Sequence, residues 1–157
     1  MKVSEVMTRE VWTCRADDTA NTAAQIMWEK DCGCAPVVDA DGRLVGMITD
    51  RDLCMGAYTQ GRALREIRVA DVMSKDVHSC GSAATIDFAE KLMREHRIRR
   101  IPVVDFVGRP VGLLSLDDLA MELGRAGRTK ELKVEDVAFT LAAVCKPRGE
   151  RKTVITS

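Results

Sequence analysis

Two short patterns in this sequence could bind a nucleotide. Thr49 precedes Asp52 by three positions, and Ser115 precedes Asp118 in the same way. Each pair stands where an apolar strand should end and a helix should begin. A helix N-terminus has unpaired N–H groups and a positive dipole, which suit a phosphate. The hydroxyl can donate to a phosphate oxygen, and the carboxylate can accept from both hydroxyls of a ribose.

The same spacing also has a purely structural explanation. A hydroxyl residue followed three positions later by an acidic residue forms a capping box, which satisfies the first N–H groups of a helix without any ligand. A single copy favours this explanation. Two copies in matching surroundings favour a nucleotide site at one of them at least, so both interpretations remain open.

The surroundings of the two pairs repeat along the chain. Pro36 and Pro102 lie 66 positions apart (102 − 36 = 66), and the same offset relates many other positions. The matched pairs include Val3/Val69, Val6/Val72, Met7/Met73, Val11/Val77, Cys14/Cys80, Thr19/Thr85, Ala23/Ala89, Met27/Met93, Gly46/Gly112 and Asp52/Asp118. A fixed period defines the structural unit. Because a unit of about 55 residues buries little surface alone, the two units should share a core.

Each copy predicts the order strand, helix, strand, strand, helix. Helix starts are indicated by capping residues and helices by apolar spacing, whereas Val-rich runs around a Gly-containing turn predict a hairpin. The predicted elements are 11–14, 19–30, 35–39, 44–49 and 51–58 in the first copy, and 77–80, 85–96, 101–105, 111–115 and 117–123 in the second.

The chain accordingly divides into repeat 1 at 1–58, an exposed charged connector at 59–68, repeat 2 at 69–123, and a C-terminal part at 124–157. In the last part, 124–127 contains two glycines and should break the chain. Residues 131–145 have apolar positions at helical spacing and predict one more amphipathic helix, which would cover a sheet edge or join a dimer interface. Pro147 should end it, and the polar tail 148–157 should fray.

These motifs resemble the CBS domain family, named for cystathionine β-synthase. The resemblance covers about residues 1–123 and rests on Val-x-x-Val-Met-(Thr/Ser), Pro-Val-Val-Asp and Gly-x-x-(Thr/Ser)-x-x-Asp-Leu, each present twice. It implies an α/β fold of two β-α-β-β-α units packed sheet to sheet, a Bateman module, here with an added C-terminal helix. Such modules commonly dimerise and bind adenosine-containing ligands between the repeats. In the family, the hydroxyl of the motif contacts phosphate and the aspartate contacts ribose.

Family geometry places each motif opposite the other repeat, and this makes the first site the better anion site. Thr49 and Asp52 would face residues 96–101, whose arginines are good partners for phosphate oxygens. The expected ligand-binding residues of site 1 are Thr49, Arg51, Asp52, Val77, Ser79, Arg99, Arg100 and Ile101. The alternative for the arginines is a solvated helix end.

The second site lacks these cations. Its motif would face residues 31–35, which contain no Lys or Arg, and Asp117 stands where the first site has Arg51. Its expected residues are Val11, Thr13, Cys34, Ala35, Ser115 and Asp118. This site should prefer an uncharged or cationic adenosyl ligand, or stay empty.

Composition narrows the class of protein. The chain has 157 residues, 46% of them hydrophobic, with 24 basic and 24 acidic residues and 4% aromatics. Zero net charge and few aromatics argue against nucleic-acid binding. No secretory signal or membrane-length apolar run is present, so a cytoplasmic protein with reduced thiols is expected.

Other chemistry has weak support in the sequence. Cys32 and Cys34 lack the second ligand pair that a structural zinc site needs, and His78 and His96 lack a nucleophile or carboxylate pattern. We therefore expect no catalytic residue, no metal and no cofactor. Cys14 and Cys80 recur at matching positions and should be small buried hydrophobes.

The expected function is a regulatory module that senses an adenosine-containing ligand of the AMP, ADP, ATP or S-adenosylmethionine class. The ligand would change how the repeats pack and signal to a protein partner or across a homodimer. One alternative is a ligand-free interaction scaffold, in which the motifs are only caps. A second is nucleic-acid binding through Arg94, Arg97, Arg99 and Arg100. No membrane partner is expected.

Overall fold

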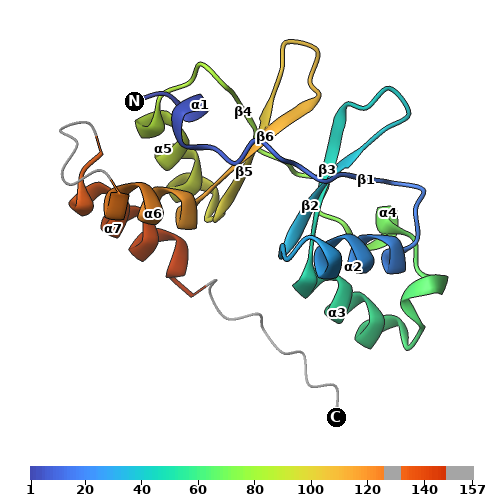
Figure 1. Cartoon of the computed structure of the whole chain (residues 1–157). Coiled ribbons are helices and arrows are strands. Elements are labelled where there is room, and N and C mark those ends of the chain that lie inside the picture. Colours follow the sequence, from blue (N-terminus) through green and yellow to red (C-terminus); the bar gives the residue numbers. More distant parts are fainter. Residues whose placement is uncertain (126–131, 148–157) are drawn as a thin grey trace.

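The computed structural model describes residues 1–125 and 132–147, and it contains two three-stranded sheets with helices around them (Figure 1). The sheets are β1-β2-β3 and β4-β5-β6 in spatial order. Their strands are β1 (Cys14–Arg15), β2 (Cys34–Val38), β3 (Leu44–Thr49), β4 (Cys80–Gly81), β5 (Arg100–Val104) and β6 (Pro110–Ser115). In each sheet the first strand is parallel to the middle one, and the third is antiparallel to it. The predicted α/β fold with two equivalent units is therefore confirmed.

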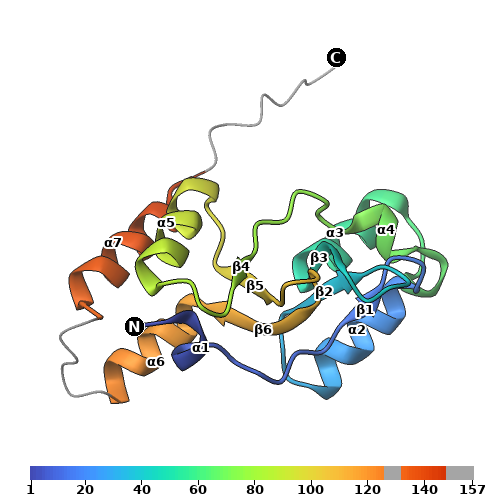
Figure 2. The ribbon, with the colours of Figure 1, turned by 90° about the horizontal axis from the view of Figure 1, so that it is seen from above.

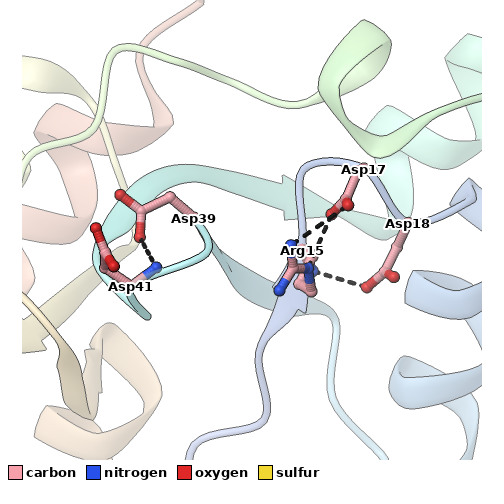
Figure 3. Close-up of polar contacts among 5 residues, drawn as sticks. All are labelled: Arg15, Asp17, Asp18, Asp39 and Asp41. Carbon is pink, nitrogen blue, oxygen red and sulfur yellow. Dashed lines mark hydrogen bonds and ion pairs between the residues drawn. The ribbon is translucent and has the colours of Figure 1, made fainter.

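The hairpins follow the turn chemistry of the sequence. Gly42 and Gly108 have φ values of 78° and 87°, a region that glycine adopts without steric cost. Before the first turn, Asp39 Oδ1 accepts a hydrogen bond from the backbone N of Asp41 at 2.9 Å (Figure 3). At the end of β1, the backbone N of Arg15 donates to Asp18 Oδ2 at 2.7 Å (Figure 3).

The helices begin where hydroxyl side chains cap them. Thr19 accepts from the N of Thr22 at the start of α2 (Ala20–Glu29), and Thr85 accepts from the N of Phe88 at the start of α5 (Ile86–His96). Helix α3 (Asp50–Gln60) follows β3 and helix α6 (Leu116–Arg125) follows β6. These bounds lie within a few residues of the predicted ones because capping is a local interaction.

Two predictions about the strands and breaks were wrong. Strands expected at 11–14 and 77–80 are the two-residue strands β1 and β4, since only Cys14, Arg15, Cys80 and Gly81 pair with a middle strand. The break expected at 124–127 does not begin at Gly124, which is part of α6. The rest of that stretch, and the tail 148–157, lie outside the described residues.

The first segment of each repeat packs on the other unit. The N of Val3, in α1 (Val3–Val6), donates to the carbonyl of Ala84 at 2.8 Å. At the equivalent place, the N of Val69, in α4 (Val69–Val72), donates to the carbonyl of Asp18 at 2.9 Å. Val3 belongs to the core of the second unit and Val69 to the core of the first. The two units are therefore interleaved.

The connector 59–68 is less exposed than its charge predicted. It contains the short helix η1 (Leu64–Glu66), and the side chain of Ile67 is 1% exposed within the first core. The carbonyl of Ile67 accepts from the N of Ala20 at 2.8 Å. The apolar residues of the connector thus fasten it to α2, although its other side chains are solvated.

The C-terminal helix α7 (Val134–Cys145) lies against α5 and α6 (Figures 1 and 2). The expectation that it would cover a sheet edge was wrong, because its apolar face packs on helices. Its buried Thr140 donates to Glu90 Oε1 at 3.1 Å and accepts from Arg94 Nη1 at 2.7 Å. Burial raises the pKa of Glu90, although the bond from Thr140 and the charge of Arg94 oppose this. Glu131, the predicted start of the helix, lies outside the described residues.

Candidate functional site

The start of α3 lines a cleft of about 910 Å³ between the two repeats. Repeat 1 contributes the Thr49–Asp52 turn and part of α3. Repeat 2 contributes the end of α4 with the segment after it, and the start of β5 with the residues before it. Val144 near the end of α7 and Lys146 just after that helix complete the lining. Three separate parts of the chain therefore meet at this cleft.

The Thr49–Asp52 pair forms the capping box that the sequence allowed. The N and Oγ1 of Thr49 donate to Asp52 Oδ2 at 2.9 and 2.8 Å, and the N of Asp52 donates to Thr49 Oγ1 at 3.2 Å. All bonds to the carboxylate use Oδ2, and Oδ1 accepts none from the residues that the structure describes. The cap therefore leaves one carboxylate oxygen in the cleft with free acceptor capacity.

The Ser115–Asp118 pair forms the same box with one more bond. The N and Oγ of Ser115 donate to Asp118 Oδ2 at 2.7 and 2.6 Å. In addition, Thr8 Oγ1 donates to Asp118 Oδ1 at 3.1 Å. The equivalent of Thr8 in the first site is Ser74, which lines the cleft but has its Oγ 3.5 Å from the carbonyl of Asp76. Both oxygens of Asp118 are thus occupied, whereas Asp52 retains one.

The cleft carries charges of both signs. Five cationic side chains and four carboxylates line it, namely Arg51, Arg97, Arg99, Arg100 and Lys146 against Asp50, Asp52, Asp71 and Asp76. Such an arrangement suits a ligand with a phosphate at one end and a hydroxyl-bearing group at the other, because guanidinium groups bind phosphate oxygens and carboxylates bind hydroxyls.

The structure brings most of the predicted site 1 residues together. Thr49, Asp52, Arg51, Arg99, Arg100 and Val77 all line the cleft. Ile101 does not, because its side chain is fully buried in the second core. Ser79 lies in a smaller neighbouring cavity of about 360 Å³, which shares Val77 with the cleft.

The predicted site 2 residues are more scattered. Ser115 and Asp118 meet at the start of α6, as described above. Cys34 lines the first cleft, and Ala35 is fully buried in the first core. Val11 and Thr13 lie before β1 and line neither of the two cavities.

Several residues of the cleft were not selected from the sequence. His78 lines it and stacks on His96, with ring centroids 3.4 Å apart and planes 16° from parallel. Ser74 could have been found, because it stands 66 positions after Thr8. Lys146 had no such signal, since it follows a helix without a counterpart in repeat 1.

Arg94 is bonded to Thr140 rather than exposed in the cleft, so the four arginines of the nucleic-acid alternative do not form one group.

The cysteine side chains fit structural roles. Burial raises the pKa of Cys14 and of Cys34 to about 11, the latter despite the nearby charge of Arg100, and burial also raises the pKa of Cys80. These thiols are therefore protonated and poorly nucleophilic at neutral pH. Cys14 and Cys80 are 3% and 5% exposed, which confirms their prediction as buried hydrophobes. Within 1–125 and 132–147, no three His, Cys, Asp or Glu side chains are grouped to hold a metal.

Comparison with known proteins identifies the family. The CBS domain model matches residues 3–56 and 69–125, so the chain belongs to the CBS domain family and contains a tandem pair. It is 38% identical over 119 residues to the CBS domain-containing protein YhcV of Bacillus subtilis, a match that covers 76% of this chain and 83% of YhcV.

A solved structure with the same fold has bound ligands. The CBS domain pair of protein MJ0100, in complex with 5′-methylthioadenosine and S-adenosyl-L-methionine, has a TM-score of 0.71 and 25% identity, and the match covers 79% of this chain and all of that one. The chain is also 32% identical to inosine-5′-monophosphate dehydrogenase of Methanocaldococcus jannaschii over 148 residues, which are 93% of this chain but 28% of the enzyme. CBS pairs are thus regulatory ligand-binding modules, alone or attached to enzymes.

In the described part of the chain, every helix is too short or too polar to cross a membrane.

Proposed function

We propose that this protein is a cytoplasmic regulatory module that binds a phosphate-bearing adenosine ligand in the cleft at Thr49 and Asp52. The observation that carries the proposal is the free Oδ1 of Asp52 in the same cleft as Arg99 and Arg100. The carboxylate oxygen would accept from ribose hydroxyls. The guanidinium groups would bind phosphate oxygens.

The hydroxyl of Thr49 would donate a hydrogen bond to a phosphate of the ligand. It now donates to Asp52 Oδ2, because a carboxylate can only accept. To donate to a phosphate, the hydroxyl must rotate and give up that bond, while the backbone N of Thr49 still holds Oδ2. Ligand binding would therefore replace one bond of the capping box and keep the others.

The adenosine class is supported by likeness to MJ0100, whose pair binds two adenosyl compounds. The cationic side chains of the present cleft favour a member of that class with phosphate groups, such as AMP, ADP or ATP. A ligand that bridges both repeats would favour one packing of the units through its differential affinity for the two states. That change would reach a protein partner or the second subunit of a homodimer.

A thermal-shift screen tests the proposal. The panel contains AMP, ADP, ATP, S-adenosylmethionine, NAD and GMP. A ligand at 100 times its dissociation constant stabilises by about 2.7 kcal/mol, which should raise the midpoint by roughly 5–10 °C in a chain of this size. We expect the adenine nucleotides to produce this shift and Asp52→Ala to reduce it to about half or less at the same ligand concentration, with GMP giving none.

The ligand-free scaffold is the second candidate, and it is favoured by the completeness of both capping boxes. If the boxes are only caps, Asp52→Ala lowers stability by about 1 kcal/mol, and no compound in the panel shifts the midpoint. The screen therefore separates the two candidates.

A further inference from the structure

The end of α7 forms part of the cleft. Val144 and Lys146 line it beside the arginines that precede β5. Arg97 Nη1 lies 3.5 Å from the carbonyl of Pro147, and Arg99 Nη2 lies 3.6 Å from Cys145 Sγ. Arg99, a proposed phosphate partner, thus contacts the last residue of this helix, and the nearby Arg97 contacts the chain just after it.

The rest of α7 is held by packing on the second unit. Leu132, Val137 and Val144 belong to the second core, and Thr140 joins Glu90 and Arg94 in a buried chain of hydrogen bonds. Val144, at 8% exposed, belongs both to this core and to the lining of the cleft. The position of Lys146 in the cleft therefore depends on whether α7 is docked.

We propose that α7 is a ligand-sensitive wall of the cleft: Lys146 contacts the phosphate groups of the bound nucleotide, and ligand binding and docking of α7 stabilise each other. This inference rests on the proposed function of the cleft. Coupling between two such events is reciprocal, so the docked state of the helix reports occupancy of the cleft.

The contacts favour cooperation over competition. A guanidinium has five N–H donors, and the bonds from Arg97 to Pro147 and from Arg99 to Cys145 use one nitrogen each. A phosphate can bind the remaining donors while these bonds persist. Lys146 then adds a further cation that is lost from the cleft when α7 leaves.

The test measures amide hydrogen exchange of residues 134–145 in the full-length protein, with and without saturating ATP, together with ATP affinity by calorimetry. The two variants are Lys146→Met, which removes the charge in the cleft and keeps the side-chain stem, and Lys133→Met, its matched control at the opposite end of α7. We expect ATP to slow exchange of α7 in the wild type. Lys146→Met should weaken ATP binding about tenfold, and Lys133→Met should leave the affinity within about twofold of the wild type.

Each other result overturns a defined part of the argument. If ATP and AMP both fail to bind the wild type, the proposed function fails and the coupling fails with it. If ATP binds but exchange of α7 is unchanged and the two variants behave alike, the cleft stands and the coupling is wrong. Faster exchange of α7 with ATP would show competition and would also overturn the inference.

Discussion

The Thr49–Asp52 and Ser115–Asp118 turns are equivalent in local structure, yet only the first has a free carboxylate oxygen. The difference comes from a third residue on the segment that crosses from the other repeat. Thr8 bonds to Asp118, whereas Ser74 lies near the carbonyl of Asp76 instead. A repeated motif therefore does not make two equal sites, because a distant segment decides which copy keeps a carboxylate oxygen with free acceptor capacity.

The residues across from each motif differ in the same direction. Positions equivalent to Arg99 and Arg100 are Gly33 and Cys34 in the first repeat. Another pair of equivalent positions is in contact in both repeats but with different side chains. In repeat 2 the ring of His78 stacks on that of His96. In repeat 1 the equivalent residues are Trp12 and Lys30, and Lys30 Nζ lies 3.9 Å from the ring centroid of Trp12. The two repeats thus have the same backbone arrangement at these positions but different side chains.

The two aspartates provide the largest expected contrast. Asp52→Ala should weaken AMP binding about 10- to 100-fold, because it removes charge-assisted bonds to the ribose. Asp118→Ala should change the affinity less than about twofold, since Asp118 is occupied by Ser115 and Thr8. Isothermal titration calorimetry measures both. Equal losses in the two variants would contradict the asymmetry.

Gly46 in β3 and Gly112 in β6 each lie against the segment that comes from the other repeat, and their substitution tests how tightly that segment packs. A Cβ at Gly46 would lie 2.6 Å from Met73 Sδ and 3.1 Å from the backbone O of Ser74, whereas the three atoms nearest to a Cβ at Gly112 are all side-chain atoms of Met7, the first at 2.5 Å. Gly46→Ala should therefore lower the free energy of unfolding by about 1–2 kcal/mol, and Gly112→Ala by less, because a methionine side chain can move. Urea unfolding measures both, and a larger loss in Gly112→Ala would contradict this reasoning.

Removal of the hydroxyls of Thr8 and Ser74 should have a smaller effect on the free energy of unfolding. Thr8→Val deletes the bond to Asp118 at an exposed site and should cost about 0.5–1 kcal/mol of stability. Ser74→Val should cost less, because the only bond of Ser74 Oγ in the described residues is the long one to Asp76. AMP affinity should stay the same in Thr8→Val, since the second motif still faces no arginine. A second equivalent of bound AMP in Thr8→Val would show that Thr8 alone closes the second site.

The pH dependence of stability should separate the two central helices. Glu90 on α5 is buried beneath α7, and its equivalent on α2 is Ala24. Because burial raises the pKa of Glu90, the folded protein holds this proton more firmly than the unfolded chain. The contribution of Glu90 to the free energy of unfolding should therefore decrease as the pH rises from its ordinary pKa of 4.5 to its raised pKa, and stay at the lower level above it.

Glu90→Gln should remove this part of the pH dependence and make the protein slightly more stable at neutral pH, because the amide oxygen can still accept from Thr140. Urea unfolding at a series of pH values measures the change, with Ala24→Gln as the matched variant on α2. If the free energy of unfolding of Glu90→Gln depends on pH as in the wild type, Glu90 is not the source of this pH dependence.

Much of the fold follows from local sequence. The capping threonines Thr19 and Thr85 and the turn glycines Gly42 and Gly108 act through bonds to residues close in the chain, so α2, α5 and the two hairpins were predicted within a few residues. The short helices α1, η1 and α4 were not predicted. The strands β1 and β4 are shorter than predicted because only two residues of each pair with a middle strand, although β2 and β5 extend further alongside. No pattern within one segment contains that information.

The sequence by itself determined the repeat, the two capping boxes and the residue types of the first cleft. The tertiary structure alone decided that Thr8 occupies Asp118, that Ile67 is buried and that Lys146 lies beside the arginines. These contacts join residues far apart in the chain. They form only when packing fixes the segments relative to one another, so spacing along the sequence could not reveal them.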